Sequence, residues 1–436
     1  MAELGRLTLR QVSRRFLPLL IVGYFVSFID RVNVGFAALQ MNADLRLSAS
    51  AFGFGAGLFY LSYALLEVPS NLLMRRLGAR RWLARIMISW GLLAAAMALV
   101  SGPRSFYAMR LLLGAAEAGF FPGVILFLTD WYPPAQRARV ISLFMMAIPL
   151  SSFLGAPLSA QLLQLDGLGG LRGWQWLYLV EGAPAVLLGL LTLLVLDDSP
   201  AEARWLAPER RVWLQRQLLP ATMHGATGTA AIAARRTVWQ LSRDRTVQVA
   251  ALMCAGSAGV SQCLANWQPQ IVKSFGLSLT ATGSAAAVPY LIATVAMVWW
   301  GHRSDRRGER IFHTAAPLAL TTLSLGVALW LHGFWPMLML LTLVLVAIYA
   351  FKGPFWALSA DWMAGPDAAA GLALTNAVAA AAAFGANWLF GLIHDATGSY
   401  ALAMQPMTVL SFAGLAALLT SRMVSRGRSG RPSPVA

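Results

Sequence analysis

The sequence predicts an all-α integral membrane protein with twelve transmembrane helices, and three observations lead to this prediction. Of the 436 residues, 58% are hydrophobic and only 12% are charged, whereas a soluble globular protein carries roughly 25% charged residues. Twelve apolar runs are each long enough to cross a bilayer, which needs roughly 20 helical residues. Lys and Arg gather in the loops on one side of these runs, as the positive-inside rule leads us to expect.

The twelve runs give the expected transmembrane helices in chain order. They lie near residues 16–39, 51–74, 82–101, 105–130, 138–163, 174–196, 246–271, 280–301, 311–332, 335–358, 369–393 and 401–421. The two termini and the loops that follow even-numbered runs hold 27 of the 34 Lys and Arg residues, and the opposite side holds four. This asymmetry predicts a multi-pass protein of the inner (plasma) membrane with both termini in the cytoplasm.

A long polar break after the sixth run divides the chain. We expect three parts: residues 1–200 as an N-terminal six-helix bundle, 201–243 as a cytoplasmic linker with an amphipathic helix, and 244–436 as a C-terminal six-helix bundle with a basic tail. The amphipathic helix has Pro208 near its start, a position that favours Pro. The rest of the linker, 220–234, is rich in Ala, Gly and Thr and is expected to be flexible.

The loop after the second span of each half has a similar sequence, rich in Arg and with a Gly. One loop contains Arg75, Arg76 and Gly78, and the other contains Asp305 and Arg306 followed by an Arg and a Gly. Duplication of a helix bundle is typical of secondary transporters, whose binding site lies between the halves near the midplane.

Two adjacent charges, Asp30 and Arg31, lie in the middle of the first run. A charge at the bilayer centre costs on the order of 2.5–3.5 kcal/mol on insertion scales. Neighbours on a helix point about 100° apart, so each charge needs its own partner on another helix, in water or on a ligand. Two interpretations follow: a binding site for a charged solute in which one group takes a proton, or a structural ion pair between helices. The first is favoured because helix packing can use cheaper groups.

Several stretches of the chain match one family of transporters. They comprise residues 30–37, 63–71, 78–82, 110–122, 174–182, 267–273, 353–356 and 395–400. With them the chain resembles a major facilitator superfamily transporter, within it the anion:cation symporter family, and in that family the branch of tartrate, phthalate and 4-hydroxyphenylacetate permeases. The resemblance runs the whole length. It implies two pseudo-symmetric six-helix bundles and proton-coupled symport of a small organic anion by alternating access.

The resemblance also implies roles for four charged residues. Asp30 and Glu117 would be the protonatable pair, and Arg31 and Arg110 would contact the substrate. Arg110 and Glu117 are seven residues apart in the fourth span and share a face, about 10.5 Å apart along the axis. This is too far for a direct pair, so each is available to the first span or to a substrate. The alternative is that each has a separate structural partner.

The chain departs from the family pattern at several positions. Arg75 stands where the superfamily usually has an acid, Ala380 where the family has a second Asn, and Asn387 follows further along. Lys352 stands mid-span, one residue before a Gly-Pro pair, where a small or neutral residue is expected. A Lys cation suits a carboxylate, and with Arg31 and Arg110 it would let an anion touch both halves. The alternative is that Lys352 snorkels to an interface or pairs with an acid.

Other polar residues in the spans have weaker assignments. Tyr63 is expected to offer a hydroxyl or stacking contact to the substrate, whereas Glu181 is expected to have a packing or gate role. Asn266 and Asn376 are either substrate donors or polar contacts between helices. A cytoplasmic latch between the halves is expected from four loop residues; they are Arg76, Gly78, Asp305 and Arg306.

The sequence contains no metal-binding cluster, phosphate-binding glycine loop or nucleophile elbow. We therefore expect no enzymatic activity, no cofactor and no bound nucleic acid. The expected partners are a small organic anion, a proton and the lipid bilayer, and the protein is expected to be a monomer. Two alternatives remain open: an anion exchanger or exporter of the same fold, and a transporter-like carboxylate sensor.

Overall fold

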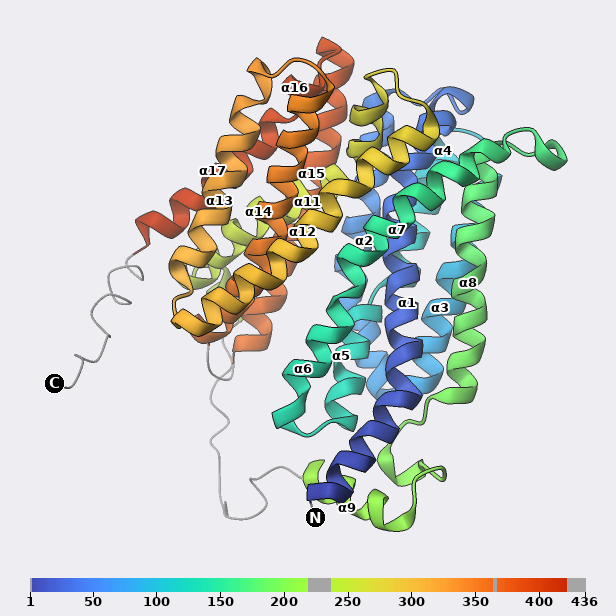
Figure 1. The fold of residues 1–436 in the computed structure, drawn as a ribbon, viewed down its shortest axis with the longest axis vertical. Coiled ribbons are helices and arrows are strands. Elements are labelled where there is room, and N and C mark those ends of the chain that lie inside the picture. The colour runs from blue at the N-terminus through green and yellow to red at the C-terminus, as the bar shows by residue number, and fades with distance from the viewer. Residues whose placement is uncertain (1, 219–236, 364–366, 422–436) are drawn as a thin grey trace. The chain divides into compact units, whose positions relative to one another are not determined.

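The computed structural model of the protein describes residues 2–218, 237–363 and 367–421, which are helical with no strand among them (Figure 1). The helices of the first half are α1 (Ala2–Asp44), α2 (Ala49–Leu77), α3 (Ala79–Ala96), α4 (Pro103–Glu117), α5 (Phe120–Trp131), α6 (Pro134–Met145), α7 (Ala147–Leu162), α8 (Gly173–Val195) and α9 (Pro208–Leu218). Those of the second half are α10 (Val238–Ser242), α11 (Arg245–Lys273), α12 (Leu279–Arg307), α13 (Ile311–Gly326), α14 (Phe334–Trp362), α15 (Ala368–Thr397), α16 (Tyr400–Ala403) and α17 (Gln405–Thr420).

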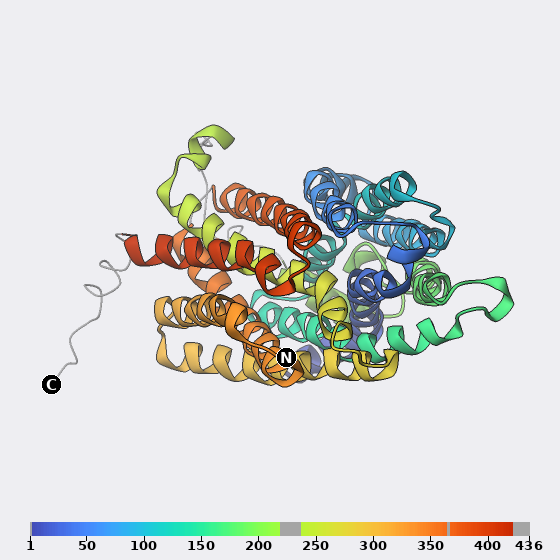
Figure 2. The ribbon, with the colours of Figure 1, turned by 90° about the horizontal axis from the view of Figure 1, so that it is seen from above.

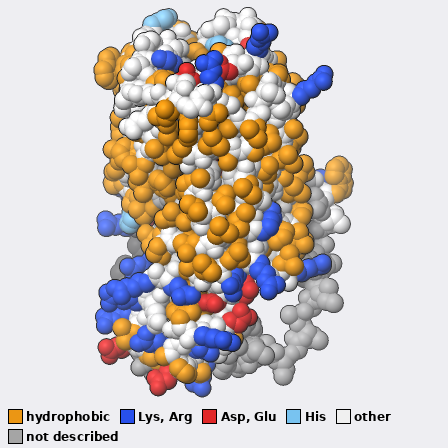
Figure 3. Space-filling view, turned by 90° about the vertical axis from the view of Figure 1, so that its right-hand side faces the viewer, with side chains coloured by type: hydrophobic (Ala, Val, Ile, Leu, Met, Phe, Trp, Pro, Cys, Tyr) orange, Lys and Arg blue, Asp and Glu red, His pale blue; other side chains and the backbone are white. Residues whose placement is uncertain are grey.

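The predicted fold class is confirmed. Twelve helical stretches in the described residues are long and apolar enough to cross a membrane, and each overlaps one of the twelve predicted runs. Figure 3 shows a broad hydrophobic band on one face of the molecule, with Lys and Arg side chains gathered below it. Three predicted spans are each divided between two α-helices: 105–130 into α4 and α5, 138–163 into α6 and α7, and 401–421 into α16 and α17.

The linker is described only in part. A helix, α9, is present where one was expected, and Pro208 is its first residue, where the N–H that Pro lacks would have no helical partner. The flexible segment expected over 220–234 and the basic tail after residue 421 lie outside the described residues.

The chain divides into two compact units that differ from the predicted domains. The first unit comprises Met1–Gln40 and Ser62–Ile232, and the second comprises Met41–Leu61 and Ala233–Ala436. Residues 41–61, expected in the N-terminal bundle, thus group with the C-terminal half. The reason is close backbone packing between α2 and α15, since a Cβ on Gly53 would lie 2.2 Å from the carbonyl oxygen of Asn387.

Small residues also bring helices together inside the first unit. Helix α3 packs along α8, and a Cβ added to Gly182 of α8 would lie 2.8 Å from the backbone nitrogen of Ala95. Seen from above, several of the helices coloured blue to green appear nearly end-on (Figure 2). In the second unit, α11 packs against α15 and α17, and α14 packs against α12 and α13.

Candidate functional site

A break in the fourth span sets the position of Glu117. Helix α4 ends at Glu117 and α5 begins at Phe120. Between them Gly119 has φ +87°, a left-handed conformation, and a Cβ there would lie 2.3 Å from Oγ of Ser70. Only Gly fits both the backbone conformation and the space. The break leaves the Glu117 side chain, 1% exposed, at the C-terminal end of a half-helix.

Arg31 of α1 pairs with this carboxylate. Its Nε and Nη2 donate to the same oxygen, Oε1 of Glu117, at 2.9 and 2.7 Å. The Ser27 hydroxyl, one turn earlier on α1, donates to that oxygen at 2.6 Å. The Arg31 cation also lies at the C-terminal end of α4, where the helix dipole favours positive charge. Arg31 therefore has a partner on another span, which is one of the three possibilities that the sequence left open.

Arg31 is also held by aromatic rings. Its guanidinium carbon lies 4.9 Å from the ring centroid of Tyr63 in α2 and 5.0 Å from that of Phe28 in α1. Aromatic faces stabilise a desolvated guanidinium. The Tyr63 ring thus contacts Arg31, which is itself a predicted substrate-binding residue.

Asp30 has neutral hydrogen-bond donors around it. The indole Nε1 of Trp90, on α3, donates to Oδ2 of Asp30, and Nδ2 of Asn33 donates to Oδ1 at 3.2 Å. The Asp30 side chain is 3% exposed. Arg110 of α4, itself 1% exposed, interacts electrostatically with Asp30. Asp30 and Arg31 thus face different partners, because adjacent residues of a helix point in different directions.

Glu181 of α8 belongs to the same buried region. Its Oε1 accepts a hydrogen bond from the Ser159 hydroxyl at 2.7 Å, and its carboxyl group interacts electrostatically with that of Asp30. Its Oε2 has no hydrogen-bond partner among the described residues. The first unit therefore buries three carboxyl groups, those of Asp30, Glu117 and Glu181, with two arginines.

The second unit holds the remaining predicted substrate residues. Nδ2 of Asn266 in α11 donates to Oδ1 of Asn387 in α15 at 2.8 Å, and both residues are fully buried. Asn376 is half-buried in α15. The ammonium of Lys352 lies 4.2 Å from the ring centroid of Tyr349, close enough to Cys254 of α11 for an electrostatic interaction. Lys352 thus lies against a ring of its own helix, α14, and beside one neighbouring span of its unit, α11.

Two of the four predicted latch residues, Gly78 and Asp305, contact side chains of their own units. In the first unit, a Cβ on Gly78 (φ +87°) would meet the Asp198 carboxylate, whose Oδ1 accepts from the backbone N–H of Arg80 at 2.8 Å. Arg76 is exposed in the last turn of α2, and Arg306 in the last turn of α12. Both cations lie where a helix C-terminus favours positive charge.

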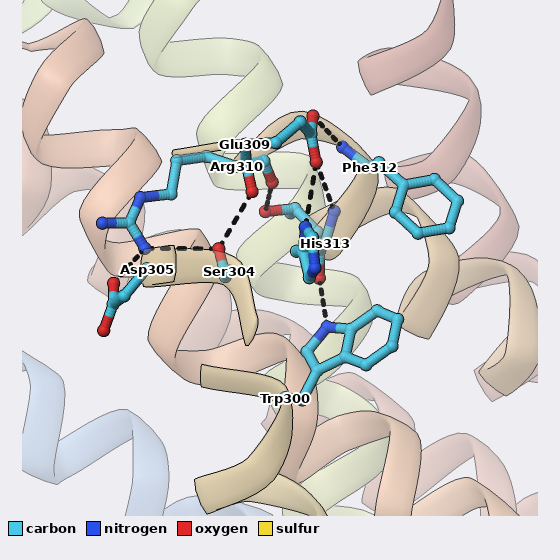
Figure 4. A network of polar contacts seen from close by, with 8 residues as sticks. Trp300, Ser304, Asp305, Glu309, Arg310, Phe312 and His313 are labelled. Carbon is cyan, nitrogen blue, oxygen red and sulfur yellow. Dashed lines mark hydrogen bonds and ion pairs between the residues drawn. The ribbon is translucent and has the colours of Figure 1, made fainter. Parts of the chain in front are cut away.

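The loop between α12 and α13 forms a polar network in the second unit (Figure 4). Asp305 pairs with Nη1 of Arg310 at 2.5 Å, and Ser304 donates to the backbone oxygen of Glu309 at 3.0 Å. The Glu309 carboxylate accepts from the N–H of Phe312 at 2.7 Å and lies 2.9 Å from Nδ1 of His313. This network fixes the start of α13.

Sequence reasoning missed several partners. Trp90, Ser27 and Ser159 all bind charged side chains of the first unit, and nothing in a single sequence distinguishes them from other Trp and Ser residues in the spans. Glu181 was noted but assigned to packing or a gate. Within the described part of the chain, no group of three or more His, Cys, Asp or Glu side chains could hold a metal ion.

Twelve spans in two compact units, one of which buries a network of charged side chains, define a polytopic transport protein of the membrane. The family model described as Major Facilitator Superfamily matches residues 20–351. The chain belongs to this superfamily, and it is a transporter, not an enzyme.

The individual proteins to which the chain is similar are also transporters by name. The chain is 44% identical over 398 residues to a protein of Agrobacterium vitis named "Putative tartrate transporter", covering 91% of this chain and 87% of that protein. It is 36% identical over 411 residues to the quinolone resistance transporter of Acinetobacter baumannii, covering 93% of each. Its fold is similar to that of a bacterial homologue of the human lysosomal transporter Spinster, with TM-score 0.74, 18% identity and coverage of 96% and 98%.

Proposed function

We propose that the protein is a secondary active transporter that carries a small organic anion, a hydroxy- or aromatic carboxylate, into the cytoplasm together with a proton. The observation that supports this proposal most is the buried pair between Arg31 and Glu117, next to Asp30 and Arg110. Charges inside a membrane domain are expensive and are retained mainly where they serve a substrate or a proton pathway.

The pair provides a way to couple substrate to proton. A carboxylate that binds the Arg31 guanidinium competes with Glu117 for the same donors. Glu117 would then be a buried carboxylate without its cation, which is strongly unfavourable unless it takes up a proton. Anion and proton therefore load together, and the loaded site carries less unbalanced charge through the alternating-access cycle. Asp30 is proposed as the second proton-carrying group.

Other predicted residues supply the remaining contacts in this proposal. Arg110 and Lys352 are the further cations for the anion, and Tyr63 positions Arg31 and offers its hydroxyl. Asn266 has its Nδ2 occupied by Asn387, while its Oδ1 has no hydrogen-bond partner among the described residues. That oxygen suits a substrate hydroxyl, and Asn376 is proposed as a second amide contact.

The membrane placement is also part of the proposal. The distribution of Lys and Arg supports an inner-membrane protein with both termini in the cytoplasm. Arg76, Gly78, Asp305 and Arg306 are proposed as a cytoplasmic latch that biases the two access states. The protein is proposed to work as a monomer. The name of the Agrobacterium vitis relative supports a hydroxycarboxylate such as tartrate as a first substrate to test.

A second candidate function is export, which the name of the quinolone resistance relative favours. The same charged groups could exchange one anion for another or drive a solute outward. The direction of proton-driven movement separates this candidate from uptake.

The test is transport by purified protein in proteoliposomes. With the outside acidified, we expect labelled tartrate or another member of a carboxylate panel to accumulate, and a protonophore to abolish accumulation. Glu117→Gln is expected to lose proton-driven accumulation while retaining anion exchange. Glu209→Gln, an exposed change in α9, is the control. Normal accumulation by Glu117→Gln would refute the coupling role, and proton-driven loss of solute from the vesicles would favour export.

A further inference from the structure

A basic cavity lies in the first unit, lined by residues of α1, α3, α9 and the segment before α9. Its volume is about 690 Å³. Four arginines line it: Arg15 of α1, Arg80 of α3, Arg204 in the segment before α9, and Arg211 of α9. These side chains come from separate elements, so the cavity is a product of the fold and not of one basic stretch.

Two of the arginines are held in place by hydrogen bonds to the end of α8. Nε of Arg15 donates to the carbonyl oxygen of Val195 at 3.1 Å, and Nε of Arg80 donates to that of Leu193 at 2.6 Å. Both carbonyls belong to the last turn of α8, where the helix leaves its oxygens unpaired. Among the described residues, no hydrogen bond or ion pair reaches an Nη atom of either arginine. The outer edges of two fixed guanidinium groups are therefore available to a ligand.

The acids of the cavity do not balance this charge. Asp197 accepts a hydrogen bond from Nε1 of Trp205 at 2.6 Å and lies 3.9 Å from Nε of Arg15. Glu202 is exposed and makes no side-chain hydrogen bond or ion pair with another described residue. Four arginines and two carboxylates leave a formal excess of two positive charges. The ring of Trp205 also lies 4.8 Å from the Arg15 guanidinium carbon.

The guanidinium N–H donors that line the cavity favour an oxyanion as its ligand. Planar guanidinium groups bind tetrahedral oxyanions through paired N–H donors, with phosphate as the favoured example. Arg15 directly precedes the buried Phe16, where the first apolar run begins, and α9 is a short basic helix beside the cavity. Basic and aromatic side chains at the end of a membrane span are typical of the lipid headgroup region. We propose that this cavity binds the phosphate of an anionic phospholipid headgroup.

The cavity is separate from the proposed transport site. Arg15 and Asp30 are fifteen residues apart on α1, which is about 22 Å along the helix axis. The proposal therefore does not depend on the proposed function. A transported carboxylate and a headgroup phosphate can be bound at the same time.

The test uses the purified full-length protein in neutral detergent. Thermal unfolding is measured with added phosphatidylglycerol, with phosphatidylcholine, and with inorganic phosphate alone. We expect phosphatidylglycerol to raise Tm in a saturable way, because a ligand that binds only the folded state stabilises it, and phosphatidylcholine to have little effect. The double variant Arg15→Gln/Arg204→Gln is expected to weaken phosphatidylglycerol binding by about tenfold or more.

The matched control is Arg6→Gln/Arg10→Gln, which removes the same charge from exposed positions of α1 outside the cavity. Should the first double variant fail to fold, the single change Arg204→Gln at an exposed residue replaces it. A phosphatidylglycerol effect that survives in the control and is lost in the cavity variant supports the site. An equal shift with inorganic phosphate would assign the site to a soluble phosphate. No shift, or equal weakening in both double variants, overturns the proposal.

Discussion

Arg31 directs two donors, Nε and Nη2, at a single oxygen of Glu117. Removing one partner leaves the other as a buried ion, which costs roughly 3–5 kcal/mol, whereas replacing both ions with apolar groups is often neutral. We expect Arg31→Met and Glu117→Met each to lower Tm strongly, and the double variant to recover most of the lost stability. The double variant is expected to show no proton-driven transport.

The Tm values of the wild type, the two single variants and the double variant, measured in detergent, test the expected stabilities. The proteoliposome assay tests the expected loss of transport. If the double variant were as unstable as the sum of the two single variants, the pair would not be coupled in the folded protein.

Lys352 and Lys273 are the only lysines of the sequence, which gives a matched comparison. Lys352 is half-buried in α14, and Lys273 lies at the end of α11, where it donates to the carbonyl of Leu277. We expect Lys352→Met to lower carboxylate uptake by about tenfold or more, because a charge-assisted contact to the anion is lost. Lys273→Met should leave uptake nearly unchanged. Equal uptake by both variants would remove Lys352 from the substrate site.

Glu309 provides a pH-dependent contribution to stability outside the spans. Burial tends to raise its pKa, but hydrogen bonds from the N–H groups of Phe312 and His313 and from the His313 ring outweigh this effect and lower the pKa below 4.5. A lowered pKa means that the stabilisation is present above the ordinary value and is lost as pH falls through the folded-state value.

We therefore expect Glu309→Gln to destabilise the start of α13 by about 1 kcal/mol at pH 7. The difference from wild type should shrink as the pH is lowered below about 4.5. Thermal unfolding over a pH series measures this difference in stability, with Glu209→Gln as the control. A difference that stays constant down to acid pH would show that the Glu309 charge is not responsible.

Asp395 of α15 caps the start of α2 inside the second unit. Its two carboxylate oxygens accept the backbone N–H groups of Ala49 and Ser50 at 2.9 and 2.8 Å. We expect Asp395→Ala to lower stability by about 1 kcal/mol, and Asp395→Asn, which keeps one acceptor oxygen, to lower it less. The Tm values of the two variants show which substitution lowers the stability more. An Asn variant no more stable than the Ala variant would contradict a capping role.

The spans were predictable because apolar length and loop charge are local properties of the sequence. The position of Arg31 opposite Glu117 was partly predictable, since both are costly charges that need partners on other helices. The break after Glu117 was not, because the left-handed conformation of Gly119 depends on its contact with Ser70, and the chain has 38 glycines. Trp90 was likewise one of sixteen tryptophans, and its bond to Asp30 is set by how α1 and α3 pack.

The grouping of residues 41–61 with the second unit was not predictable for a similar reason. A hydropathy pattern separates six runs from six, but it does not show that the first part of α2 packs against α15. That grouping depends on the close approach of Gly53 and Asn387, which the sequence alone does not pair.

The interruption between α4 and α5 also has a consequence for isotope exchange. Residues at the start of a helix have N–H groups without a carbonyl four residues earlier in the same helix. In α5 these include Phe120 and Phe121, while Pro122 has no N–H at all. The centre of the fourth span should therefore take up deuterium sooner than the uninterrupted helices α2 and α8, although it is a membrane-embedded peptide.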